Sequence, residues 1–81
     1  MNNIKDRVID IIGRTLKLDD RERAMLSQET GYEQLRKWTS ARHAEIIVAL
    51  EDEFGIEIDG RDIARLNDVA KIVAYLQSRQ S

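Results

Sequence analysis

The chain has 81 residues, a formal net charge of −2, one histidine and no cysteine. A chain this short forms a single domain with a small core, and the absence of cysteine excludes disulfides, thiolate nucleophiles and thiolate metal sites. No apolar run approaches the roughly 20 residues that span a bilayer, and residues 1–6 lack the pattern of a signal peptide. We therefore expect one cytoplasmic domain over residues 1–81, without a metal site or a membrane span.

Apolar residues near the start of the chain recur at helical spacing and predict a first helix. Its inward stripe is formed by Ile4, Val8, Ile11, Ile12 and Leu16. From residue 18 to residue 38 the period weakens, and a segment of this length predicts a structured, functional loop. Four of its residues are expected to return to the core: Met25, Leu26, Tyr32 and Leu35.

A second helix is predicted from Ser40 to Phe54, because apolar residues again recur at helical spacing. Gly55 suits the left-handed conformation that commonly ends a helix. The segment 56–58 alternates apolar and acidic residues, but a single strand has no partner here, so we expect an extended connector. The residues predicted to face inward from this helix are Ile46, Ile47, Leu50 and Phe54.

Two further helices are predicted in the last third of the chain. Asp59 is expected to cap a short third helix that carries Ile63 and Leu66, and Asn67 is expected to cap the fourth. The sequence thus predicts an all-α fold, a small four-helix bundle with three longer helices, one short third helix and a long loop between the first two. The inward residues of the fourth helix are Val69, Ile72, Val73 and Leu76.

The second helix and its connector are strongly acidic. No lysine or arginine occurs from residue 43 to residue 60. Such a stretch repels nucleic-acid phosphates and favours protein partners with basic patches. Its six acidic residues are Glu45, Glu51, Asp52, Glu53, Glu57 and Asp59.

The start of the second helix resembles the attachment site of the acyl carrier protein family. The window Trp38-Thr39-Ser40-Ala41-Arg42-His43 is similar to the Trp-Asp-Ser-Leu-x-His of one subset, and residues 49–58 read Ala-Leu-Glu-Asp-Glu-Phe-Gly-Ile-Glu-Ile. The resemblance implies that 4′-phosphopantetheine, taken from coenzyme A, is attached to Ser40. It also implies a bundle of the acyl-carrier type. Without its neighbours, Ser40 would be read as a serine that caps the helix.

The function that the resemblance implies is that of a freestanding, monomeric carrier and not an enzyme. Its partners would be a phosphopantetheinyl transferase, an acyl- or aminoacyl-loading enzyme and downstream acyl-processing enzymes. The pathway would be a specialised fatty-acid, polyketide or related one. A carrier-like interaction domain that is never modified is the alternative, and a small hydrolase using Ser40 and His43 is a third interpretation.

Two departures from the family pattern bear on modification. Thr39 stands where the family has an aspartate, which removes a carboxylate beside the serine, and Ala41 offers less apolar surface than leucine. Basic residues also flank the site. We expect Thr39 and Arg42 to neighbour the phosphate at the positive end of the helix, although Arg36, Lys37 and Arg42 could equally form a solvated rim.

The exposed face of the second helix is where the resemblance implies that partner enzymes dock; an ordinary solvated face is the alternative. His43 follows Ser40 by three positions, but a catalytic pair would also need an orienting acid and an oxyanion site. If Thr39 is the cap, Trp38 and His43 instead form a hydrophobic staple. The residues expected to contact partners are Ala41, Glu45, Val48, Glu51 and Asp52.

Overall fold

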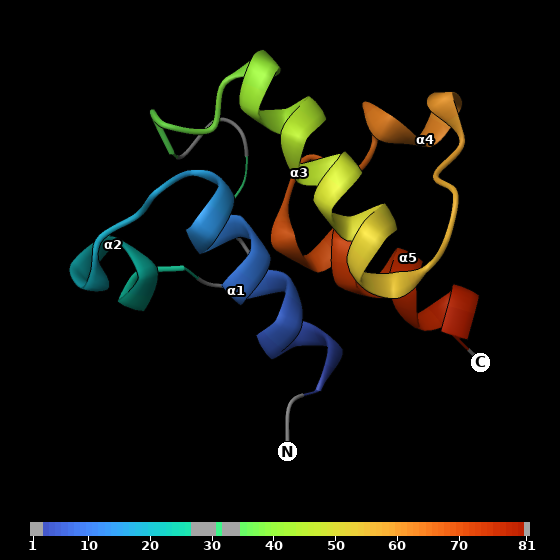
Figure 1. Ribbon diagram of the computed structural model, residues 1–81, viewed down its shortest axis with the longest axis horizontal. Helices are drawn as coiled ribbons and strands as arrows, with labels where there is room; N and C mark the ends of the chain where they lie inside the picture. The colour runs from blue at the N-terminus through green and yellow to red at the C-terminus, as the bar shows by residue number, and fades with distance from the viewer. Residues whose placement is uncertain (1–2, 27–30, 32–34, 81) are drawn as a thin grey trace.

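The computed structural model describes residues 3–26, 31 and 35–80 of the chain. Figure 1 shows α1, α3 and α5 as the longer helices, with α2 beside α1 and α4 between α3 and α5 along the chain. None of the helices in the described ranges combines the length and hydropathy of a membrane span. The elements are α1 (Ile4–Thr15), α2 (Asp20–Ala24), α3 (Ser40–Phe54), α4 (Gly60–Ile63) and α5 (Val69–Gln80).

The core lies where α1 contacts both α3 and α5. Every residue predicted to face inward from the second and fourth helices is buried, as is the stripe of the first helix except Ile4, which is partly buried. The all-α class and the three longer helices are therefore confirmed. Among the described residues, the largest fully buried side chains are Trp38, Ile12, Ile46, Leu50, Ile72, Leu76, Val8 and Val69.

The long connection expected between the first two long helices contains a short helix over residues 20–24, which was not predicted from the sequence. The side chain of Asp19 accepts a hydrogen bond from Glu22 N–H at 2.8 Å, and Glu22 Oε1 accepts one from Asp19 N–H at 3.1 Å. This reciprocal capping box begins α2 and was a recognisable sequence signal. Leu26 is buried as expected, whereas Met25 is 75% exposed.

Two other expectations concern the same loop. Leu35 packs against the core as predicted. Tyr32 lies outside the described residues.

The caps of the two C-terminal helices differ in how well they were predicted. Asp59 caps α4 by accepting a hydrogen bond from Arg61 N–H at 2.9 Å, as expected. The predicted cap of the last helix, Asn67, is wrong: Asp68 Oδ1 accepts from Lys71 N–H at 2.7 Å. Asn67 and Asp68 both have side chains that can cap a helix. Asp68 is the cap because it immediately precedes Val69, the first residue of α5. Leu66 is buried, but it lies beyond the end of α4.

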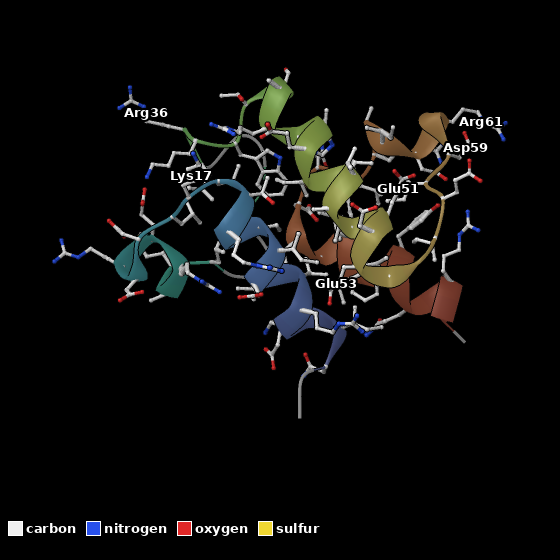
Figure 2. All side chains as sticks on the ribbon, viewed as in Figure 1. Lys17, Arg36, Glu51, Glu53, Asp59 and Arg61 are labelled. Atoms are coloured by element: carbon white, nitrogen blue, oxygen red, sulfur yellow. The ribbon has the colours of Figure 1, made fainter. Side chains whose placement is uncertain are left out.

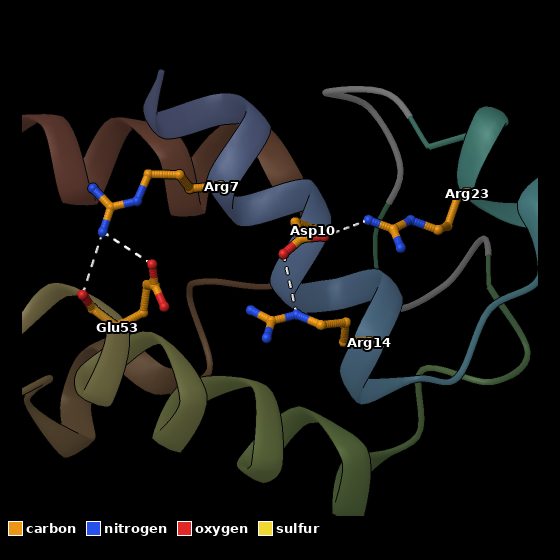
Figure 3. Close-up of polar contacts among 5 residues, drawn as sticks. All are labelled: Arg7, Asp10, Arg14, Arg23 and Glu53. Carbon is orange, nitrogen blue, oxygen red and sulfur yellow. Dashed lines mark hydrogen bonds and ion pairs between the residues drawn. The ribbon is translucent and has the colours of Figure 1, made fainter. Parts of the chain in front are cut away.

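Charged side chains connect the helices at the surface, as Figure 3 shows. Arg7 of α1 donates to the backbone carbonyl and the carboxylate of Glu53, at 3.3 and 3.1 Å, and stacks over the Phe54 ring. It therefore places a positive charge at the C-terminal end of α3, which the helix dipole favours. Asp10 pairs with Arg14 on its own helix and with Arg23 of α2.

Candidate functional site

The site lies at the first turn of α3. Thr39 is the cap, and its hydroxyl accepts a hydrogen bond from Arg42 N–H at 3.2 Å, so the alternative in which Ser40 itself caps the helix is wrong. Ser40 is the first helical residue and is exposed. The first turn of α3 contains no acidic residue. The partial positive charge at this end of a 15-residue helix is thus not offset within the turn, and an anion joined to Ser40 would meet it.

The expected staple between Trp38 and His43 is present. The Trp38 ring is 1% exposed and stacks on the His43 ring, with centroids 5.9 Å apart and planes at 27°. Trp38 Nε1–H also donates to His43 Nδ1 at 2.9 Å. The pair therefore fixes the direction in which the chain enters α3 through both packing and a directed hydrogen bond.

His43 makes a second contact that the sequence did not indicate. Its Nε2 lies 2.8 Å from the backbone carbonyl oxygen of Ile63, the last residue of α4. Indole N–H can only donate and a carbonyl oxygen can only accept. One proton, on Nε2, satisfies both partners. Because Trp38 and Ile63 engage the two ring nitrogens, the arrangement gives no support to a serine–histidine catalytic pair.

A groove of about 430 Å³ adjoins Ser40 and runs toward α4. Its wall carries the apolar side chains of Ile63 and Ala64, and a Cβ built at Gly60 would point into open space. Sequence patterns had not placed these residues of α4 and its C-cap beside Ser40, because only tertiary packing brings them next to α3. The groove is lined by Ser40, His43, Gly60, Ile63, Ala64 and Asn67.

The basic residues around Ser40 differ in their surroundings. Arg42 donates to Glu45 Oε2 at 2.7 Å, and Lys37 donates to Glu22 Oε1 at 2.8 Å. The hydrogen bond from Lys37 and the backbone hydrogen bond from Asp19 hold the pKa of Glu22 below its usual value. Arg36 is exposed, and Figure 2 shows its side chain extending away from the fold.

Four of the five residues expected to contact partners are exposed on α3. Val48 is 56% exposed, and it lines a shallow groove of about 390 Å³ together with Glu45 and Asp52. Ala41 is exposed one turn before Glu45. These four residues recur on one side of the helix, at spacings of three and four.

Glu51 is separated from this group. Its Oε2 accepts a hydrogen bond from Ile58 N–H at 2.7 Å, and the side chain is half-buried. Figure 2 labels it on the part of α3 that the connector to α4 passes. Glu51 therefore holds the extended connector against α3, a role that its acidic neighbours in the sequence did not reveal. Among the residues that the structure describes, no group of three or more histidine or acidic side chains could hold a metal ion.

Comparison with known proteins matches residues 6–76 to the family model described as "Phosphopantetheine attachment site". The chain is 32% identical over 79 residues to an acyl carrier protein of Buchnera aphidicola subsp. Acyrthosiphon pisum (strain 5A), covering 98% of this chain and 95% of that protein. It is 25% identical over 80 residues to one of Rickettsia typhi, covering 99% of this chain and 90% of that protein. The fold is similar to the solution structure of a protein from Anaplasma phagocytophilum described as an acyl carrier protein, with a TM-score of 0.86, 30% identity, and coverage of 99% and 91% of the two chains.

Proposed function

The chain belongs to the phosphopantetheine-binding acyl carrier protein family, and we propose that it carries acyl or aminoacyl groups on a 4′-phosphopantetheine arm attached to Ser40. The observation that carries this proposal is the position of Ser40. It is the exposed first residue of a 15-residue helix, and it lies within residues 6–76, which match the family model. A carrier of this kind presents substrates to other enzymes and is not itself a catalyst.

The residues around Ser40 fit such an arm. A phosphate on the Ser40 hydroxyl would meet the positive end of α3, and the groove of about 430 Å³ beside it offers the arm an apolar wall. Thr39 orders the first turn through its cap. Arg42 lies in the same turn as Ser40; its guanidinium is paired with the Glu45 carboxylate, and a phosphate on Ser40 would compete with that carboxylate for it. When attached, the arm supplies a terminal thiol that holds acyl groups as thioesters.

The surface proposed for docking is the exposed side of α3 formed by Ala41, Glu45, Val48 and Asp52. Its exposed valine, with acidic residues on either side, suits a partner that presents a small apolar contact within a basic rim. We expect a phosphopantetheinyl transferase, a loading enzyme and acyl-processing enzymes to bind here. Glu51 is omitted from this surface because its carboxylate is bonded to Ile58 N–H.

We assign the carrier to a specialised fatty-acid, polyketide or related pathway. Thr39 and Ala41 replace the aspartate and leucine of the family pattern at the two positions beside the serine. Both changes alter what a transferase would contact, since one removes a charge and the other removes apolar surface. A pathway with a dedicated transferase would accommodate them.

The test is intact-protein mass spectrometry after incubation with coenzyme A, Mg²⁺ and a broad-specificity phosphopantetheinyl transferase. We expect the parent chain to gain the mass of one phosphopantetheine unit. Ser40→Ala is expected to gain none. Ser78→Ala, which removes an exposed serine from α5, is the matched control and should be modified like the parent.

Arg42→Glu is assayed alongside, with Arg65→Glu as its control of equal charge change on another part of the surface. The modification rate should fall only in the first variant, because only Arg42 lies at the attachment turn. If the parent gains no mass even with a transferase from its own organism, the carrier assignment fails. The chain would then be an interaction domain of the carrier fold that is never modified, which the changes at Thr39 and Ala41 would explain.

A further inference from the structure

We propose that His43 is a positioning residue that joins the attachment turn of α3 to α4 and so sets the width of the groove beside Ser40. The connection is a chain of two hydrogen bonds, from Trp38 Nε1–H to His43 Nδ1 and from His43 Nε2–H to the Ile63 carbonyl oxygen. We call these two hydrogen bonds the His43 bridge. It rests on the proposed function only in that the groove is taken to receive the arm.

The two ends of the His43 bridge are not equally anchored. Trp38 is 1% exposed and belongs to the core, so its indole ring is a rigid support. Ile63 is only partly buried and ends a helix of four residues that has no fully buried side chain. A helix this short has little stability of its own. Tertiary contacts at α4 must therefore decide where it lies.

The local contacts of α4 do not replace the bridge. Asp59 caps its first turn and also pairs with Arg61, but both interactions lie within α4 and its cap. Leu66 follows α4 and is buried, which anchors the segment after the helix. The side chain of Ile63 also packs against the core, and the His43 bridge adds a directed hydrogen bond that joins the carbonyl end of α4 to the helix bearing Ser40. The distance of 2.8 Å between His43 Nε2 and the Ile63 carbonyl oxygen is that of a well-formed hydrogen bond.

The position of the His43 bridge makes it relevant to the arm. Ser40 and His43 are three residues apart on one side of α3, and both line the groove with Ile63. His43 lines the groove on the α3 side and bonds the Ile63 carbonyl on the α4 side. Loss of this hydrogen bond would let the α4 side move away from Ser40. An arm on Ser40 would then contact a wider and less defined surface.

The first test uses the unmodified chain, so it is independent of whether Ser40 accepts an arm. Glutamine can place an amide N–H near the position of histidine Nε2, whereas asparagine reaches only the position of Nδ1. His43→Gln and His43→Asn are therefore matched neutral variants that keep and lose the donor to Ile63. Trp38→Phe removes the indole donor and keeps the bond to Ile63.

Amide hydrogen exchange measured by NMR reports the position of α4. Asp62, Arg65 and Leu66 donate backbone hydrogen bonds in and after this helix, so their amides are the probes. Relative to buried amides of α1, we expect them to exchange about three- to tenfold faster in His43→Asn and at near the parent rate in His43→Gln. In the parent, ¹⁵N shifts should show the proton on Nε2 and an unprotonated, hydrogen-bonded Nδ1.

In Trp38→Phe the Nδ1 shift should move while the α4 amides keep their protection, unless the core itself loosens. If the core loosens, the α1 amides will also exchange faster. The ratio of the α4 exchange rate to the α1 exchange rate then still tests the bridge. Equal exchange ratios in the parent, His43→Gln and His43→Asn, or a proton on Nδ1, would overturn the proposal. Neither result bears on modification of Ser40.

The second test uses protein carrying the phosphopantetheine arm. The arm should change the amide shifts of Ile63 and Ala64 in the parent and in His43→Gln, and change them clearly less in His43→Asn. If the arm perturbs these residues equally in all three proteins, His43 does not control the groove. Failure of the parent to accept the arm would count against the proposed function alone, because the first test stands without it.

Discussion

At the scale of single residues, Lys17 is the most strained position of the described backbone. Its φ is 55°, and it is the only residue other than glycine with positive φ in the parts of the chain that the structure describes. It follows α1, where Lys17 N–H donates to the Arg14 carbonyl and Leu18 N–H donates to the Gly13 carbonyl at 2.9 Å. These two bonds form the motif that ends many helices, and the motif requires a left-handed residue at this place.

Lys17→Gly is expected to raise the free energy of unfolding by about 0.5–1 kcal/mol. Glycine removes the cost of about 1–2 kcal/mol that a side chain incurs in this conformation, and gives part of that gain back as entropy of the unfolded chain. Urea denaturation measures the change. Ala74→Gly, at an exposed position inside α5, is the control and should lower stability by about 1 kcal/mol. Equal destabilisation by both changes would show that Lys17 is not strained.

At the scale of elements, α2 depends on charge more than on a core. It has five residues and no buried side chain; its capping box and two ion pairs, Glu22 with Lys37 and Arg23 with Asp10 of α1, hold it in place. Lys37 lies two residues before the cap of α3. A single carboxylate therefore links α2 to the segment that enters the attachment turn, and Glu22 must be ionised for the link to form.

Acid should weaken this link. The hydrogen bond from Lys37 lowers the pKa of Glu22 from its ordinary value of 4.5. A lowered pKa in the folded state means that the stabilisation is fully present above pH 4.5 and is lost as the pH falls through the lowered value. The difference in Tm between the parent and Glu22→Gln should therefore be small but present at neutral pH and should vanish in acid.

The matched control for this titration is Asp20→Asn, which removes a neighbouring carboxylate of α2. The difference in Tm between Asp20→Asn and the parent should not show the pH dependence expected for Glu22→Gln. Thermal unfolding followed by circular dichroism from pH 3 to pH 7 makes the comparison. A difference for Glu22→Gln that persists unchanged at the acid end would contradict the role given to the ionised carboxylate.

At the scale of the whole molecule, one backbone bridge joins two distant connections. Gly31, in the long segment between α2 and α3, pairs with Asp68, which caps α5. A Cβ at Gly31 would overlap the carbonyl oxygen of Asn67 and come within 2.9 Å of Asp68 Cβ. Only glycine lets the two backbones come this close. Gly31 therefore allows the segment between α2 and α3 to pair with the segment that precedes α5.

Gly31→Ala should lower the free energy of unfolding by about 1–3 kcal/mol, because the backbone must shift to admit the methyl group. Gly60→Ala is the contrasting control, since a Cβ there meets no atom within 4 Å and alanine favours a helix. It should leave stability unchanged or raise it slightly. Chemical denaturation compares the two variants. A Gly31→Ala protein as stable as the parent would mean that the bridge does not contribute to the fold.

The sequence by itself determined the parts of this protein that depend on local chemistry. Helical spacing of apolar residues identified the inward sides of α1, α3 and α5, because burial of one stripe is what stabilises such helices. Asp59 was predicted as a cap, Thr39 was a candidate cap, and Trp38 with His43 was predicted as a staple, since each uses atoms only a few residues apart. The window around Ser40 indicated the carrier family for the same reason.

Only the tertiary structure decided which distant groups meet. The partner of His43 is the backbone carbonyl of Ile63, and every residue has such a carbonyl, so composition and spacing carry no sign of the choice. Glu51 resembles its acidic neighbours on α3 until Ile58 N–H is placed beside it, and Gly31 is an ordinary loop glycine until Asn67 and Asp68 approach it. Contacts between backbone groups far apart in sequence are set by how the helices pack, and packing is a property of the whole chain.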